Sequence, residues 1–197
     1  MDRREAIKRA ALLSGYAISA TALSSVWQSC QRDAGPEAEA WEPVFFSPEQ
    51  GTAVAEISET ILPATDTPGA KEVRVHEFVD QFAKDCLTAE EQTQLREGLQ
   101  QLLADCQSET GKAFIDSSAE ERLAFLNKQD ADARRILEVN PMLPEEERPV
   151  FMKLKWLVLM GYFTSEKVGK EVTAFLPVPG KYEPCAPYEE GQPAWTI

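Results

Sequence analysis

The sequence predicts an all-α protein, a single compact domain of five or six helices followed by an irregular, proline-rich C-terminal tail. Three observations support this fold class. Apolar residues recur at spacings of three and four, helix-capping signals precede those segments, and no convincing apolar–polar alternation of a strand is present. The chain has 197 residues and is 43% hydrophobic, which suits one domain with a sizeable core.

The motif SPEQ at 47–50 predicts the start of the first helix. Its serine and glutamine form a capping box, and its proline suits the first helical position. Pro63 should end this helix. The apolar stripe between these signals comprises Val54, Ile57 and Ile61.

A turn-rich loop at 64–71 should lead into a second helix from Glu72, and Thr88 should open a third helix through another capping box. The short connection between them predicts an antiparallel pair. The inner face of the second helix should carry Val75, Phe78, Val79, Phe82 and Cys86. That of the third should carry Leu95, Leu99, Leu102 and Cys106.

A serine at 117 or 118 should cap a fourth helix with Leu123 and Leu126 inward. The fifth helix should follow Pro149. Its sequence, VFMKLKWLVLMGYF, is apolar on nearly all sides apart from two lysines, which predicts a place at the centre of the core. We expect Gly161 to end this helix or to let a neighbour come close. A short last helix should run to about Thr173.

The N-terminal segment 1–30 has the features of an export signal. Arg3 and Arg4 resemble a twin-arginine motif, and the uncharged run at 11–27 is too short and too rich in small residues for a confident membrane span. Cys30 after this run is a candidate for lipidation, although an uncleaved anchor and an ordinary amphipathic helix remain alternatives. We therefore expect an exported, periplasmic protein, held at the membrane by a lipid.

Three further segments complete the predicted organisation. Residues 31–44 lack periodicity and read as a tether, 45–174 form the helical domain, and 175–197 form the tail. The chain has a formal charge of −13, and because the leader is basic, the remainder carries −15. Such a charge repels phosphate backbones and anionic lipid, so we expect no nucleic-acid partner.

The sequence shows no recognisable active site. It has no glycine-rich nucleotide loop and no C-x-x-C pair, and its one histidine, His76, rules out a two-histidine metal site. We read Asp66 as a turn residue and the acidic run at 145–147 as the start of a helix. We therefore expect no catalytic, cofactor-binding or metal-binding residues in this chain.

The cysteines are more informative. Cys86 and Cys106 should lie on inner faces, and the intervening helix of about 24 Å keeps them beyond disulfide reach, so both are predicted to be buried thiols. Cys185 lies in the irregular tail and should be exposed. An intermolecular disulfide, an internal disulfide and a free thiol all remain open for it.

Several stretches together resemble the gluconate 2-dehydrogenase subunit 3 family. The order and spacing of these stretches carry the resemblance, which extends over nearly the whole chain. They are the twin-arginine leader, FFSPEQ (45–50), ISETILPATDTPGA (57–70), VHEFVD (75–80), LMGYFTSEKVG (159–169), PVPGKYEPC (177–185) and Trp195.

The resemblance implies a non-catalytic accessory subunit of a membrane-associated dehydrogenase complex. In that family the large subunit is a flavoprotein of the glucose-methanol-choline oxidoreductase type, which oxidises a sugar or polyol with FAD and passes electrons to a c-type cytochrome or a quinone. The small subunit supplies the export signal for the folded large subunit. The alternative is a free-standing periplasmic helical lipoprotein that binds a small ligand.

We expect the tail to contact the large subunit. A proline-rich segment loses little conformational freedom on binding, and its aromatic residues are of the types enriched at interfaces. A tail folded back on its own helices is the alternative. The expected interface residues are Tyr162, Phe163, Pro177, Pro179, Tyr182, Cys185, Tyr188 and Trp195.

Overall fold

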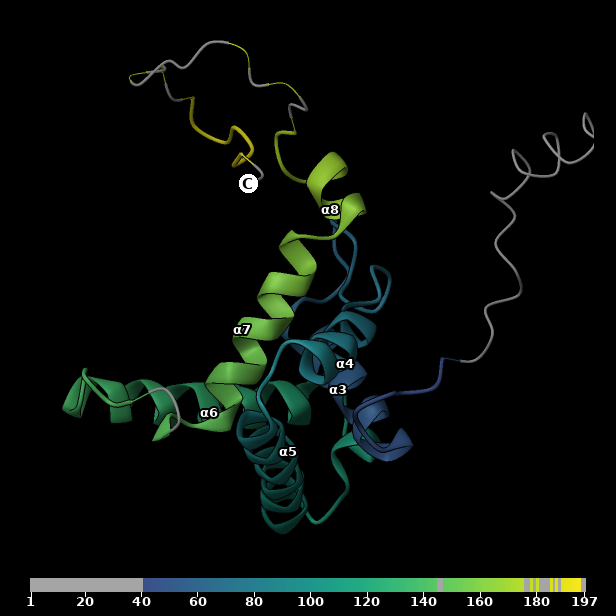
Figure 1. The fold of residues 1–197 in the computed structure, drawn as a ribbon, viewed down its shortest axis with the longest axis vertical. Coiled ribbons are helices and arrows are strands. Elements are labelled where there is room, and N and C mark those ends of the chain that lie inside the picture. Colours follow the sequence, from purple (N-terminus) through teal and green to yellow (C-terminus); the bar gives the residue numbers. More distant parts are fainter. Residues whose placement is uncertain are drawn as a thin grey trace, which may run out of the picture. The chain divides into compact units, whose positions relative to one another are not determined.

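The computed structural model describes residues 41–144, 147–175, 178, 180, 185, 187 and 189–195. This part of the chain contains six α-helices and one 3-10 turn, which confirms the all-α class (Figure 1). A single isolated bridge joins described residues 174 and 195, where the Ala174 N–H donates to the Ala194 carbonyl over 2.8 Å. The elements are α3 (Pro48–Ile61), α4 (Val75–Asp85), α5 (Ala89–Thr110), η1 (Phe114–Asp116), α6 (Ala119–Val139), α7 (Val150–Phe163) and α8 (Glu166–Glu171).

Three helices begin at reciprocal capping boxes. In each, the side chain of the capping residue accepts from the backbone N–H three residues later, and the side chain at that later position accepts from the N–H of the cap. Both bonds are local, so they form wherever the four-residue motif occurs at a helix start. The pairs are Ser47 with Gln50, Thr88 with Glu91, and Ser118 with Glu121.

Helix α7 is the centre of the core. It packs against α3, α4, α5, α6 and α8. Leu154, Leu157 and Val158 on its inner side are almost fully buried, and each such side chain contributes roughly 1.5–3 kcal/mol of transfer free energy. Gly161 lets α4 approach closely, because a Cβ atom there would lie 2.6 Å from Phe78 Cδ1. The helix continues through Gly161 to Phe163.

The predicted second helix needs two corrections. It begins at Val75 and not at Glu72, because residues 71–74 form a turn in which Arg74 has the left-handed φ of 56°. It also ends at Asp85, so Cys86 is the capping residue and is exposed. The prediction of a buried Cys86 is therefore wrong. The buried Cys106 is confirmed, and burial raises the pKa of its thiol.

One prediction about helix packing also needs correction. Leu123 is 49% exposed, and Phe125 and Leu126 carry the inner face of α6 near this point. Both α4 and α5 pack against α7, and their antiparallel orientation stays a prediction. A stripe of apolar residues defines which face is inward only after the neighbouring helices have been placed.

A buried carboxylate holds the start of the domain. Asp80 on α4 is 1% exposed. Its Oδ2 accepts from the Val44 N–H over 2.7 Å, and its Oδ1 accepts from the N–H groups of Phe45 and Phe46 over 3.1 and 2.9 Å. Both phenylalanine rings are buried, and the guanidinium of Arg96 lies 4.5 Å from the Phe45 ring centroid. Asp80 thereby connects the segment before α3 to the core.

Candidate docking surface

One side of α7 is apolar and only partly covered by the rest of the domain. Successive residues of an α-helix are rotated by about 100°, which places five apolar residues of α7 within one sector of roughly 100°. Trp156 is 54% exposed and Phe163 is 49% exposed, and the other three are half-buried. We call this sector the α7 apolar face; it comprises Met152, Trp156, Leu159, Met160 and Phe163.

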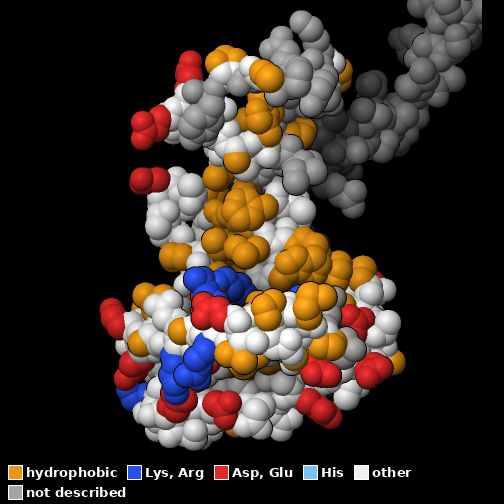
Figure 2. All heavy atoms as spheres, turned by 90° about the vertical axis from the view of Figure 1, so that its left-hand side faces the viewer, with side chains coloured by type: hydrophobic (Ala, Val, Ile, Leu, Met, Phe, Trp, Pro, Cys, Tyr) orange, Lys and Arg blue, Asp and Glu red, His pale blue; other side chains and the backbone are white. Residues whose placement is uncertain are grey.

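The figures show where this surface lies. In Figure 1, no described helix lies over the left side of α7 above α6. That side faces the viewer in Figure 2, where hydrophobic side chains gather into a patch between α6 and the C-terminal part, with Lys and Arg side chains at its lower end. A contiguous apolar patch on a protein surface commonly marks an interaction site.

The two lysines of α7 flank the apolar face but turn toward neighbouring helices. Lys153 Nζ lies 2.7 Å from Glu91 Oε1 on α5, and Lys155 Nζ lies 2.6 Å from Asp130 Oδ1 on α6. Lys153 and Thr88 donate to Glu91 and lower the pKa of its carboxyl to about 2. The hydrogen bond from Lys155 likewise lowers the pKa of Asp130. Both cations therefore pair with carboxylates of the domain, Asp130 also pairs with Arg134, and the sector between the two lysines carries no charge.

Trp156 is held in place by aromatic residues of α4. Its ring meets that of Phe82 edge to face, with centroids 6.2 Å apart, and Phe82 lies 5.7 Å from Phe78. Beside Trp156 is a hollow of about 250 Å³, which is lined by Arg148, Met152, Lys153 and Trp156. A fixed aromatic side chain next to a hollow resembles the hot spots of protein–protein interfaces.

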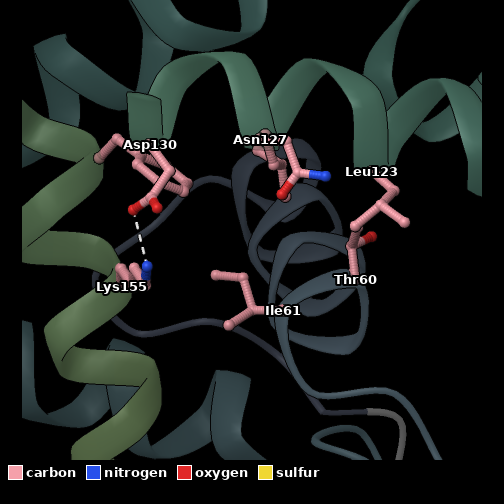
Figure 3. Close-up of a pocket in the computed structure, with 8 residues that line it drawn as sticks. Thr60, Ile61, Leu123, Asn127, Asp130 and Lys155 are labelled. Atoms are coloured by element: carbon pink, nitrogen blue, oxygen red, sulfur yellow. Dashed lines mark hydrogen bonds and ion pairs between the residues drawn. The ribbon is translucent and has the colours of Figure 1, made fainter. Parts of the chain in front are cut away.

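The pocket between α3, α6 and α7 is small. Figure 3 shows Asp130 and Lys155 directed at each other on one side of it, with Asn127, Leu123 and Thr60 farther along. Its volume of about 160 Å³ is below the range of about 300–1,000 Å³ that is usual for small-molecule sites. This pocket gives little support to the alternative of a ligand-binding protein.

A larger hollow of about 460 Å³ lies between α3, α5 and η1. Ala53, Leu103 and Phe114 contribute apolar walls, and the polar residues that line it, such as Gln100 and Gln107, are exposed. The buried polar side chains among the described residues, Ser58, Asp80 and Ser117, do not line it. Without a buried polar group to orient a small ligand, it also resembles a surface groove more than a ligand site.

The titratable groups do not assemble into a reactive centre in the described ranges. No group of three or more His, Cys, Asp or Glu side chains there could hold a metal ion. His76 Nε2 lies 3.8 Å from Glu77 Oε1, and burial lowers the pKa of this histidine, which favours the neutral imidazole at pH 7. None of the described helices combines the length and the hydrophobicity needed to span a bilayer.

Residues 48–180 match the family model of gluconate 2-dehydrogenase subunit 3. The chain belongs to this family. The match confirms the resemblance seen in the sequence, and the family name describes one subunit of a dehydrogenase complex. Searches of curated proteins and of solved structures found no match. The range that matches the family model includes the whole α7 apolar face, whereas Cys185 and Trp195 lie beyond residue 180, where the match ends.

The predicted interface residues of this subunit 3 family member fall into different environments. Phe163 belongs to the α7 apolar face, and Trp195 is 63% exposed. Tyr162 is 4% exposed and its hydroxyl donates to the Pro68 carbonyl over 2.8 Å, so this residue packs in the core of the domain. Its contact with the large subunit stays a prediction. Cys185 is exposed with a free thiol.

The remaining predicted site residues lie outside the described part of the chain. These are Arg3, Arg4, Cys30, Pro177, Pro179, Tyr182 and Tyr188. Sequence reasoning missed Met152, Trp156, Leu159 and Met160 as surface residues. The signal was present, because a helix that is apolar on nearly every side in a domain of this size is difficult to cover completely.

Proposed function

We propose that this chain is a non-catalytic accessory subunit, which binds the FAD-containing large subunit of a gluconate 2-dehydrogenase-like complex and supports its folding, export and membrane association. The observation that carries the proposal is the only partly covered α7 apolar face in a chain of this family. A Trp and a Phe at about half exposure leave apolar area in water, and burial against another subunit would remove this area at a gain of roughly 25 cal/mol per Å².

The chemistry would belong to the partner. In this proposal the large subunit, a flavoprotein of the glucose-methanol-choline type, oxidises a sugar or polyol with its FAD, and a c-type cytochrome accepts the electrons. This chain would bind no cofactor of its own.

The N-terminal segment would direct the complex across the membrane. Arg3 and Arg4 would form the twin-arginine signal, the folded large subunit would travel as a passenger, and a lipid on Cys30 would hold the periplasmic complex at the membrane. In the tail, the exposed Cys185 thiol is accessible for a disulfide with the large subunit. Segment 175–197 would thus add a second contact.

Purification of the tagged chain from its native membranes tests the proposal. We expect a yellow, FAD-bearing polypeptide in equal amount. Replacement of Arg3 and Arg4 with lysine should retain both polypeptides in the cytoplasm. A colourless, solitary chain, together with unchanged export of the flavoprotein when this chain is deleted, would contradict the proposal. Retention of this chain alone by the arginine variant would contradict the export role.

Non-reducing electrophoresis tests the contact through the tail. The purified complex should contain a heavier band that joins the two subunits, and Cys185→Ser should remove it. The variant Cys86→Ser is a matched control, because Cys86 is also an exposed, free thiol. A heavier band that persists in Cys185→Ser and disappears in Cys86→Ser would assign the disulfide to the C-cap of α4 instead of the tail.

A further inference from the structure

The α7 apolar face has the geometry of a helix-binding seam. Met152, Trp156, Leu159 and Phe163 follow each other at spacings of four, three and four residues. This is the spacing by which one helix presents a seam to another helix, and from first to last it extends over about 16 Å. We propose that this face binds an apolar helix of the large subunit and that Trp156 is the centre of the contact; this inference rests on the proposed function.

The charges beside the seam favour a helix with an apolar stripe. Because Glu91 and Asp130 already pair with the two flanking lysines, a partner does not need to bring acidic residues to neutralise them. An approaching helix meets only side chains of Met, Trp, Leu and Phe along the seam. Burial of Trp156, Leu159 and Phe163 desolvates no ionised group, which is the cost that weakens many charged contacts. Only the hollow beside Trp156 brings a partner next to cations, those of Arg148 and Lys153.

Trp156 and the hollow beside it define the centre of the contact. The edge-to-face packing with Phe82 supports the indole on one side, which reduces the side-chain freedom that it loses on binding. The hollow of about 250 Å³ between Arg148 and Trp156 can take one large side chain of the partner. An aromatic residue that is already ordered, next to a socket for a partner side chain, is the arrangement found at interface hot spots.

The net charge argues against two other occupants. The chain beyond residue 30 has a formal charge of −15. Two copies of it repel each other, and so do this domain and an anionic lipid surface. A partner with a neutral or basic surface around an apolar helix has no such penalty. The large subunit is therefore expected to present a helix of this kind.

The first experiment measures FAD recovered with the tagged full-length chain from its native host. We expect Trp156→Glu to reduce the flavin recovered per mole of chain about tenfold or more, because a carboxylate then lies in the seam. Phe163→Ser is a second, independent variant, with an expected reduction of several-fold. Trp156→Phe should retain most of the flavoprotein.

Leu123→Glu is the matched control. Leu123 is 49% exposed, as is Phe163, but it lies on α6 outside the seam, so this variant should recover as much flavin as the unaltered chain. The thermal midpoints of all variants, measured by circular dichroism, separate lost binding from lost folding. If both Trp156→Glu and Phe163→Ser fold and keep the flavoprotein, the α7 apolar face is not the docking surface.

The second experiment tests whether the occupant is a helix. A photo-crosslinking amino acid is placed in turn at positions 152, 159 and 163, and mass spectrometry identifies the large-subunit residues that it captures. Captured residues three, four or seven apart along the partner sequence support a helix. Captured residues two apart indicate a strand and overturn the helical part of the inference.

Other outcomes identify a different occupant or a deeper failure. Two results would overturn the inference if Trp156→Glu leaves flavin recovery unchanged. The first is a dimer, detected by sedimentation, that Trp156→Glu dissociates. The second is binding of the chain to phosphatidylcholine–phosphatidylglycerol vesicles that Trp156→Glu abolishes. If the unaltered chain recovers no flavoprotein, the proposed function and this inference both fail. If Trp156→Glu and Phe163→Ser both recover as much flavoprotein as the unaltered chain, only the docking surface fails.

Discussion

Replacement of Asp80 should detach the start of the domain from its core. The carboxylate of Asp80 is almost completely buried and accepts three backbone N–H groups from residues 44–46. Alanine at this position removes all three acceptor contacts at once. Asparagine retains one oxygen, which can still accept from Phe45 and Phe46, but turns an NH₂ group toward the N–H of Val44.

The structure gives the size of the expected effect. A hydrogen bond to a charged group contributes roughly 1.5–3 kcal/mol, and a buried N–H without an acceptor costs about 1–3 kcal/mol. Val44 is 57% exposed, so water can replace part of its bond. The two buried N–H groups therefore dominate, and we expect Asp80→Ala to lower the free energy of unfolding by about 3–5 kcal/mol and Asp80→Asn by about 2 kcal/mol.

Urea unfolding followed by tryptophan fluorescence measures this difference. Asp85→Asn is the matched control on the same helix, because Asp85 is exposed and bonds only at the surface with Gln81; its effect should stay within about 0.5 kcal/mol. Hydrogen exchange should show loss of protection at Phe45 and Phe46 in the Asp80 variants. Equal unfolding free energies for Asp80→Ala and Asp85→Asn would refute the role assigned to the buried carboxylate.

Three further predictions concern the same domain. The pKa of Glu91 is lowered from 4.5 to about 2, so its stabilising effect is complete above pH 4.5 and is lost as the pH falls toward 2. Glu91→Gln should remove about 1 kcal/mol of this pH-dependent change in the free energy of unfolding. The expected change is small because the pair with Lys153 is partly exposed. Gly98→Ala should lower the free energy of unfolding by about 1–3 kcal/mol, because the new Cβ would lie 2.6 Å from Val150 Cβ. In the double variant, Val150→Ala should restore part of this loss. Deletion of 175–197 should leave the urea midpoint of the helical domain unchanged, because the described hydrophobic side chains of this segment are exposed; a clear fall in the midpoint would indicate a tail that packs on the helices.

Local features were predictable because their partners are close in sequence. A capping box joins residues three apart, so the motifs at Ser47, Thr88 and Ser118 were sufficient to predict three helix starts. The 3.6-residue period likewise predicted the inner face of α5, where Leu95 and Leu99 are fully buried. The family could be recognised for a similar reason, since it depends on the order of short motifs along the chain.

Features that depend on distant residues were not predictable in this way. In the sequence, Asp80 cannot be told from an ordinary surface acid, because the N–H groups that donate to its buried carboxylate lie 34 to 36 residues away. The exposure of Leu123 and Cys86 likewise depends on where neighbouring helices lie and on where α4 ends. Leu123 and Cys86 were assigned to inner faces from the spacing of apolar residues alone. This spacing does not determine how much of the helix surface the neighbouring helices cover.

The composition of α7 was determined by the sequence, and its exposure was determined by the fold. The segment 150–163 contains too many apolar residues for an ordinary amphipathic helix, and this much could be predicted without any coordinates. Only the packing of α3, α4, α5, α6 and α8 decided which side of it is covered and left Trp156 in solvent. The physical reason is that hydrophobicity has no direction of its own, so the neighbours that surround a helix decide which of its apolar sides is buried.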